Sequence, residues 1–354
     1  MKKIILLISL LSATLAFTAC GKDKKAAEEP KIVTVLTYSE YIDPAMIKDF
    51  EQRTGYKLQL ELYEAQEEMI AKLNASGTGL YDVIVGSDVV VQQMIHLGLV
   101  GKIDSTQIPN RVNVMPKFRH PAFDPTNDYT WPYLWGTTGI VYNDTTLSPD
   151  SLSYSMLFDS TKTKGKFSLL DESRSMLSMA LMAKGFNANS KNADQINQAA
   201  QLLLAAKKDP EFIGFDGSVA GKDKMLSGMD WAAVVFNGEA MAAIKENPKL
   251  RFGIPREGSF AWVDVMMLSS KAPNVKGAYA FMNYILDAKI GAQLANYIAF
   301  CSPNQASLPY IDKKMLADPV IYPDSATMNR LVFLADPQEA SRLYDEAWTM
   351  VKTR

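Results

Sequence analysis

The alternation of short apolar segments with helix-like segments constrains the fold of this chain more than any other feature of its sequence. The segments 32–36, 58–62 and 81–85 have the β-branched or alternating composition of strands. Helix start and stop signals lie between them, as at Asp43, which precedes a proline, and at Gly55. Strands that alternate with helices of this length favour βα units and a largely parallel sheet.

A second series of predicted elements follows the segment 131–136. Across both series the remaining predicted strands are 166–170, 232–236, 250–254 and 263–268, and the further helices are 66–75, 88–96, 175–184, 195–207, 278–286, 291–299 and 337–352. The roughly 320 residues after position 30 are enough for two lobes of ordinary domain size. We therefore expect an α/β protein with a ligand site between two lobes, at the carboxyl ends of the strands.

The N-terminus has the pattern of a secretion signal. Two lysines precede the apolar run 4–17, which is shorter than the ~20 residues needed to span a bilayer. The run ends at Phe-Thr-Ala-Cys, which resembles the lipobox of bacterial lipoproteins, although Phe17 stands where leucine is usual. The resemblance implies cleavage after residues 1–19 and acylation of Cys20. An ordinary signal peptide followed by a coincidental cysteine is the alternative.

The segment 20–30 is rich in Lys, Glu and Ala and has no apolar period, so it is predicted to be a solvated tether. Once Cys20 carries a lipid, Cys301 is the only thiol left and no disulfide can form within the chain. We expect the mature protein to be periplasmic or on the cell surface, held to a bacterial membrane by that lipid.

Composition and motifs argue against several functions. The net charge is −2, so nucleic acid is not an expected partner. The sequence contains no phosphate-binding loop, no G-x-G-x-x-G, no H-E-x-x-H, no C-x-x-C and no G-x-S-x-G. We predict a binding protein without metal, cofactor or catalytic residues. A hydrolase built on a carboxylate pair stays an alternative, because any two acidic residues can converge in space.

Aromatic residues stand beside carboxylates at the predicted strand ends. The segment 38–41, Tyr-Ser-Glu-Tyr, follows the first strand, and Asp171-Glu172 follows the strand 166–170. Trp262 and Asp264 are two apart in an extended segment, so they share a face. Carboxylates neutralise ammonium groups, and aromatic faces cover methylenes and attract cations. This pattern indicates a site for a slender cation.

The same residues have ordinary structural explanations. Tyr38 and Tyr41 could be packing aromatics, Glu40 a solvated turn residue and Trp262 a core residue. Asp264 lies between two valines in a strongly apolar segment, where an unpaired carboxylate is costly and needs a partner. A cationic site and a general polar site both remain open from these residues alone.

Several segments together resemble the periplasmic spermidine/putrescine-binding proteins of ABC importers, over nearly all of the mature chain. They are 38–41, 81–87, 123–129, 132–138, 236–238, 255–258, 262–264 and 302–304. The resemblance implies the two-lobe fold of type II periplasmic binding proteins, a polyamine ligand, an inner-membrane permease as partner and a monomer. The implied lobes are 31–136 with 264–300, and 137–263 with 301–354.

The resemblance also implies which residues line the ligand site. They are Tyr38, Ser39, Glu40, Tyr41, Ser87, Glu172, Phe236, Trp262, Asp264 and Phe300. In this implied site Asp264 and Glu40 hold ammonium groups, while the aromatic residues pack against methylenes.

Five positions depart from the family pattern. Val89 and Phe300 stand where tyrosine is common, Phe236 where tryptophan is, Ser175 where glutamate is and Leu334 where glutamine is. These changes remove a carboxylate and several hydrogen-bonding groups. A shorter diamine, a related amine or another cationic solute therefore remains open, as does the same fold with a sugar, an anion or ferric iron.

Overall fold

The computed structural model describes residues 31–145, 152–159, 161–162 and 164–354. The predicted signal peptide (1–19), the tether (20–30) and the lipidation site Cys20 lie outside the described residues.

The first lobe contains a mixed sheet whose parallel part matches the predicted βα units. β1 (Ile32–Tyr38) pairs in parallel with β2 (Lys57–Tyr63) and β3 (Val83–Ser87). β10 (Ser259–Ser269) then lies antiparallel to β3, and β5 (Thr130–Asn143) lies antiparallel to β10. The strand order in this half is β2-β1-β3-β10-β5. The sheet is therefore less parallel than the sequence predicts.

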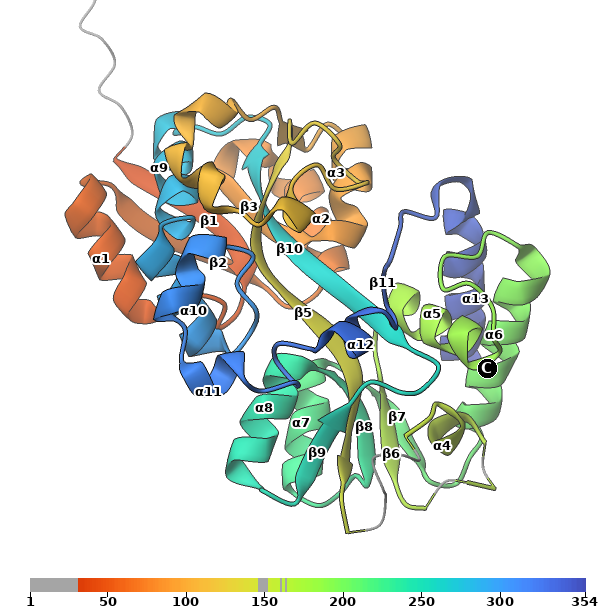
Figure 1. Cartoon of the computed structure of the whole chain (residues 1–354). Coiled ribbons are helices and arrows are strands. Elements are labelled where there is room, and N and C mark those ends of the chain that lie inside the picture. The colour runs from red at the N-terminus through yellow and green to blue at the C-terminus, as the bar shows by residue number, and fades with distance from the viewer. Residues whose placement is uncertain (1–30, 146–151, 160, 163) are drawn as a thin grey trace, which may run out of the picture.

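The same two strands carry the sheet into the second lobe (Figure 1). The second half of β5 pairs antiparallel with β8 (Ala232–Phe236) and β9 (Leu250–Gly253). β6 (Phe167–Leu170) pairs in parallel with β8 and with β7 (Phe212–Asp216). β5 and β10 belong to a sheet that runs through both lobes, so they are the segments in which the chain crosses between the lobes.

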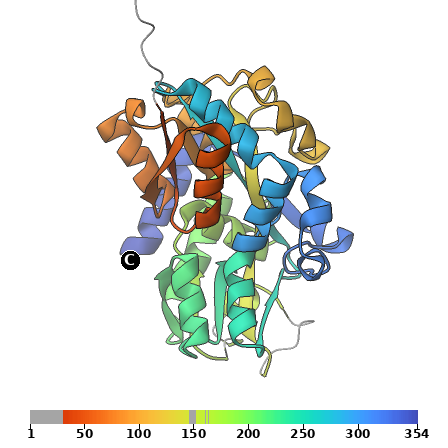
Figure 2. The ribbon, with the colours of Figure 1, turned by 90° about the vertical axis from the view of Figure 1, so that its left-hand side faces the viewer.

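Helices cover the sheets of both lobes (Figures 1 and 2). Those of the first lobe are α1 (Pro44–Thr54), α2 (Gln66–Ser76), α3 (Val91–His96), α9 (Val275–Ile285) and α10 (Ala288–Ile298). In the second lobe, α7 (Ser218–Leu226) and α8 (Asn237–Glu246) lie side by side, and α4 (Ser155–Phe158), α5 (Ser173–Ala183), α6 (Ala193–Lys207) and α13 (Ser341–Thr353) form a second group. The shorter elements are β4 (Val100–Gly101), α11 (Lys313–Leu316), α12 (Ser325–Met328) and β11 (Leu331–Phe333).

The local signals at α1 are confirmed. The Asp43 carboxylate accepts a hydrogen bond from the Ala45 N–H at 2.9 Å, and Gly55 ends the helix with a φ of +75°. A left-handed residue at this position suits glycine, which has no Cβ to clash. β5, β7, α7 and α8 were not among the predicted elements. Pro132, Gly136 and Gly139 lie within β5 and are residues that ordinarily argue against a central strand.

The packing differs from the predicted lobe boundaries in one segment. The predicted second lobe includes 301–354, but the 3-10 helix Gln305–Tyr310 packs against α10 of the first lobe. The Asn304 amide also donates to the Leu286 carbonyl at 2.8 Å. The segment 301–310 thus stays with the first lobe, whereas α13 packs on α5 and α6 in the second. None of the helices in the described ranges has the length and apolar character required to cross a bilayer.

Candidate ligand-binding site

The carboxyl ends of parallel strands from both lobes supply the site. Tyr38 ends β1 and Ser87 ends β3 in the first lobe, while Phe236 ends β8 and Glu172 follows β6 in the second. Side chains at strand ends are free of the sheet faces, so they can meet a ligand at the edge. The crossing strand β10 brings Trp262 and Asp264 to the same place.

Asp264 occupies a buried position in the middle of β10. It is opposite Ser87 on β3, and its pairing with β5 shifts register between Asp264 and Val265. Pro132 of β5 lies just beyond this shift, so the bulge falls where the partner strand lacks an N–H donor. The Asp264 carboxylate accepts a hydrogen bond from the Tyr41 hydroxyl, and the residue is only 5% exposed.

The electrostatics of the site are those of excess negative charge. The pKa of Asp264 is raised to about 7, mainly by burial, with a smaller increase from the nearby Glu172 carboxyl and an opposing decrease from the Tyr41 hydrogen bond. Burial also raises the pKa of Glu172 to about 7, against the hydrogen bond that it accepts from Ser175. The charges that act most on these two carboxyls are those of other acidic residues, Glu67 and Glu239 among them. A bound cation would relieve both the burial and the repulsion.

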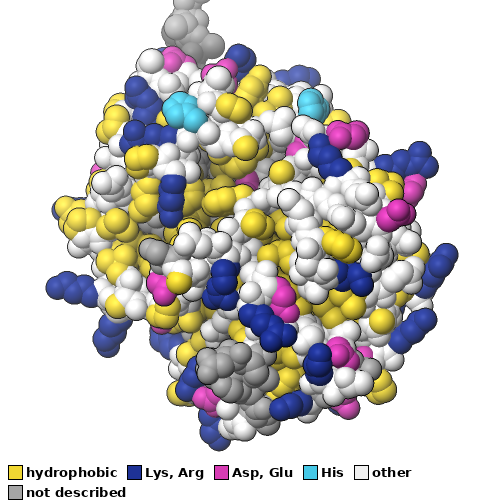
Figure 3. All heavy atoms as spheres, turned by 45° about the vertical axis from the view of Figure 1, so that its right-hand side comes forward, with side chains coloured by type: hydrophobic (Ala, Val, Ile, Leu, Met, Phe, Trp, Pro, Cys, Tyr) yellow, Lys and Arg dark blue, Asp and Glu magenta, His cyan; other side chains and the backbone are white. Residues whose placement is uncertain are grey.

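Aromatic rings form a group around Tyr41, the hydrogen-bond donor to the Asp264 carboxylate. Tyr41 lies at the centre, with ring centroids 5.3 Å from Tyr38, 5.4 Å from Tyr133 and 6.0 Å from Phe300. Trp262 continues the group, 4.8 Å from Phe300 and 5.5 Å from Phe236. Figure 3 shows hydrophobic side chains exposed across the middle of one face, at the level where the two lobes meet. The arrangement offers ring faces and edges to a methylene chain or an ammonium group.

Two glycines make this aromatic packing possible. A Cβ at Gly136 of β5 would overlap the Trp262 ring, and a Cβ at Gly238 of α8 would overlap the Phe300 ring. Glycine is therefore required at both positions because a ring approaches the backbone closely, and not because of an unusual backbone angle.

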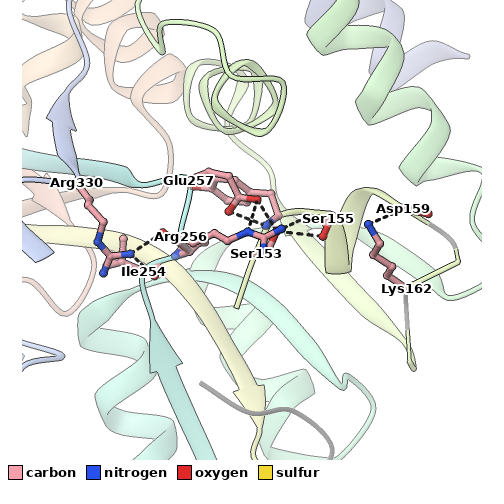
Figure 4. A network of polar contacts seen from close by, with 10 residues as sticks. Ser153, Ser155, Asp159, Lys162, Ile254, Arg256, Glu257 and Arg330 are labelled. Atoms are coloured by element: carbon pink, nitrogen blue, oxygen red, sulfur yellow. Dashed lines mark hydrogen bonds and ion pairs between the residues drawn. The ribbon is translucent and has the colours of Figure 1, made fainter. Parts of the chain in front are cut away.

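The start of β10 is fixed to the second lobe by a polar network (Figure 4). The Glu257 carboxylate accepts from the Ser153 hydroxyl and, at 3.3 Å, from the Tyr154 N–H. Arg330 donates to the Pro255 carbonyl at 3.1 Å. These bonds hold the turn that leads into β10, the strand that contains Trp262 and Asp264.

Eight of the ten predicted site residues are brought together: Tyr38, Tyr41, Ser87, Glu172, Phe236, Trp262, Asp264 and Phe300. Ser39 and Glu40 are in the turn after β1. Glu40 is exposed with a φ of +54°, so it lies at the edge of the group rather than inside it.

Four further residues belong to the site and were not predicted. The Tyr133 hydroxyl donates to the Tyr41 carbonyl at 2.6 Å, and the Tyr63 ring lies 4.4 Å from that of Tyr38. Asp88 is buried beside Ser87, and Glu239 lies in the first turn of α8, with pKa values that burial raises to about 7 in each case. An acidic residue just past a predicted strand end was the signal available for both.

The structure also shows the surroundings of the residues that depart from the family pattern. The Ser175 hydroxyl donates to the Glu172 carboxylate at 2.7 Å. At this position the family pattern has a glutamate, so a hydrogen-bond donor to Glu172 replaces a second carboxylate. Leu334 is buried, and Val89 is partly buried against the hydrophobic core. Among the residues that the structure describes, no group of His, Cys, Asp or Glu side chains has the arrangement of a metal site.

Comparison with known proteins identifies the family. Residues 45–322 match the bacterial extracellular solute-binding protein family, and the chain belongs to it. The chain is 28% identical to the spermidine/putrescine-binding periplasmic protein of Escherichia coli K12, covering 94% of this chain and 95% of that protein. It is 30% identical to a putrescine/cadaverine-binding protein of Pseudomonas aeruginosa, over the full length of both.

Solved structures agree with this assignment. A lipoprotein of Treponema pallidum is 27% identical, with a TM-score of 0.82 over 91% of this chain and 100% of that one. A spermidine/putrescine ABC transporter substrate-binding protein of Streptococcus pneumoniae is 28% identical, with a TM-score of 0.77 over 90% and 99%. The predicted fold, a two-lobe type II periplasmic binding protein, is confirmed.

Proposed function

We propose that this protein captures a polyamine such as putrescine or spermidine and delivers it to the permease of an ABC importer. The observation that carries the proposal is the buried Asp264 carboxylate, which accepts a hydrogen bond from Tyr41, lies beside a group of aromatic rings and has the Glu172 carboxyl as its charged neighbour. The names of the relatives support the same ligand class. A neutral sugar would leave this buried carboxylate without a counter-charge.

In this proposal Asp264 binds one ammonium group and the acidic residues of the second lobe bind the other. Glu172 stands across the site at the start of α5, and Glu239 lies near both Glu172 and Tyr41. The rings of Trp262 and Tyr41 would cover the methylenes between the two charges. Glu40, exposed beyond the first strand, is proposed as a contact at the edge of the ligand.

The two lobes would close on the ligand by bending of the crossing segments, and the closed form would dock on the permease. The protein would act as a monomer without cofactor, and it would bind its ligand without changing it chemically. Its proposed location is the periplasm or the cell surface, with the lipid on Cys20 as anchor. A relative of similar structure is itself a lipoprotein.

Calorimetric titration of the mature domain, starting after Cys20, tests the proposal. The protein is first stripped of bound ligand by unfolding and refolding, then titrated with putrescine, cadaverine and spermidine, with glucose and citrate as controls. Saturable binding of an amine near one to one supports the proposed class. Binding of glucose or citrate alone, or of none of these by a folded sample, contradicts it. Turnover of a glycoside by the purified protein would point to the hydrolase instead.

A further inference from the structure

A pocket separate from the candidate ligand-binding site lies in the first lobe, between the loops that follow β4 and the start of β5. It has a volume of about 240 Å³, and its lining includes Ser105, Arg111, Arg119, His120, Asn127 and Trp131. None of the residues of the proposed polyamine site lines it.

The charged side chains that line this pocket are basic. Arg119 donates from Nε to the Val114 carbonyl and from Nη2 to the Val112 carbonyl, each at 2.7 Å. Arg111 donates from Nη1 to the Ile108 carbonyl at 3.2 Å. Backbone carbonyls therefore fix both guanidinium groups without neutralising them.

Within the described ranges, neither arginine makes an ion pair, and Nη1 of Arg119 and Nη2 of Arg111 have no hydrogen-bond partner. Arg111 acts on the Asp104 carboxyl, whose pKa is lowered mainly by hydrogen bonds from Thr106 and least by Arg111. Asp104 does not line the pocket, so positive charge remains on its wall.

Trp131 and His120 also line the pocket and have ring nitrogens without a hydrogen-bond partner among the described residues. The indole Nε1–H of Trp131 is buried and has no hydrogen-bond partner in the part of the chain that the structure describes, although the residue is 5% exposed. Buried donors of this kind are rare in folded proteins and call for an explanation. The Nδ1 atom of His120 lies 3.0 Å from the Pro125 carbonyl oxygen. The backbone N–H of His120 donates to the Asn127 side-chain oxygen at 2.8 Å. Since Nδ1 faces a carbonyl it carries the proton, and Nε2 stays open.

We propose that this pocket binds a small oxyanion, through a carboxylate or phosphate group held by Arg111 and Arg119. Planar guanidinium groups match both kinds of oxyanion in two-point hydrogen bonds. The group can belong to a free anion or to an acidic side chain of a docked protein, and the chemistry of recognition is the same in either case.

The five tryptophan indole N–H signals of the mature protein, followed by nitrogen-15 NMR, provide the test. Trp131→Phe assigns the relevant signal. Inorganic phosphate stands for the free anion and N-acetyl-glutamate amide for an acidic side chain, each added at constant ionic strength with chloride as the reference. The expected result is a saturable shift of the Trp131 signal by one or both, with a dissociation constant below about 10 mM.

Arg111→Gln should weaken that binding at least about tenfold, the loss expected for a charged hydrogen bond. Arg342→Gln is the matched control, since Arg342 is an exposed arginine paired with Glu346 on α13. A shift by phosphate alone identifies a free anion, and a shift by the glutamate compound identifies a carboxylate. Linear shifts with both compounds, or equal binding by Arg111→Gln and the native protein, overturn the proposal. Putrescine affinity should be unchanged in Arg111→Gln, so this outcome is independent of the polyamine proposal.

Discussion

Asp264 lies in a strand whose side chains are all buried, where its carboxylate accepts a hydrogen bond from Tyr41 and faces other acidic residues. Burial disfavours the charged form, so the empty site favours a bound proton. A ligand ammonium favours the charged form instead. The proton and the polyamine therefore compete for the same carboxylate, and pH becomes a direct probe of the site.

The affinity for putrescine should fall as the pH is lowered. The pKa of Asp264 is about 7, against an ordinary value of 3.8, so the ligand must displace a proton below pH 7. Glu172 has the same raised pKa and is proposed to hold the second ammonium group, so the association constant should fall at least about tenfold per pH unit between pH 7 and pH 5 and level off above about pH 7. Calorimetry in buffers of different ionisation enthalpy measures both the affinity and the released proton. A flat profile between pH 5 and pH 8 would rule out this competition.

Asp264→Asn should weaken putrescine binding while stabilising the empty protein. The loss of a charged hydrogen bond costs at least ~1.5 kcal/mol, or about tenfold in affinity. Because the folded pKa lies above the unfolded one, the acid reduces stability as the pH rises from about 4 to about 7. The neutral amide removes that penalty, so the melting temperature of the empty variant at pH 8 should exceed that of the native protein.

The matched control for this variant is Asp171→Asn. Asp171 is an acidic residue adjacent to Glu172, but it is exposed and pairs with Lys352 at 2.7 Å. Its replacement should leave the affinity unchanged and alter stability little, as expected for a surface ion pair. Unchanged putrescine affinity in Asp264→Asn would refute the role assigned to Asp264.

At the scale of elements, the site depends on two long strands that contain residues unusual in strands. β5 includes Pro132 and Gly136, and the register of β10 against it shifts beside Asp264. The register shift leaves Tyr133 of β5 unpaired beside Asp264, and the glycine leaves room for the Trp262 ring. The irregularities of β5 are thus tied to the geometry of the site.

Gly136→Ala should weaken ligand binding, because its methyl group would overlap the Trp262 ring and displace it. Overpacking of this kind typically costs about 1–3 kcal/mol of folding stability, so we expect a lower melting temperature, together with weaker ligand binding from the displaced ring. Gly217→Ala is the control, since a Cβ there meets no atom within 4 Å. Calorimetry and tryptophan fluorescence of both variants distinguish the outcomes, and equal affinities would contradict the proposed contact.

At the scale of the whole molecule, the two lobes share one sheet through β5 and β10, so the ligand site forms where the chain passes between them (Figure 1). The polar network around Glu257 ties the beginning of β10 to the second lobe, whereas its far end pairs with β3 and β4 of the first. Bending of these strands would move Glu172 relative to Asp264. Closure and charge pairing are therefore coupled in the proposed function.

Cys20→Ser should release the full-length protein from the membrane without changing its fold or its ligand affinity. Acylation of the Cys20 sulfur supplies the apolar area that holds a lipoprotein at the bilayer. Detergent-phase partitioning of bacterial extracts, with the native chain and Cys301→Ser in parallel, measures the effect. Retention of Cys20→Ser in the detergent phase would argue against the predicted lipid anchor.

Much of the fold could be predicted from local sequence signals. The strands around Leu36 and Ala233 and the helix between Asp43 and Gly55 depend on hydrophobic periodicity and caps, which act over a few residues. β5 was missed because Pro132 and Gly136 are strand breakers locally, and only pairing with β10 stabilises them in a strand.

The part of the site that depends on local spacing in the chain could also be predicted. Trp262 and Asp264 stand two apart in one strand, so their shared face follows from the sequence alone. The sequence did not determine that Tyr41 would donate to Asp264, that Glu239 would join Glu172, or that Glu40 would remain exposed. These relations join residues far apart in the chain, and only the packing of the two lobes on β5 and β10 decides which of them meet and how far each carboxyl is removed from water.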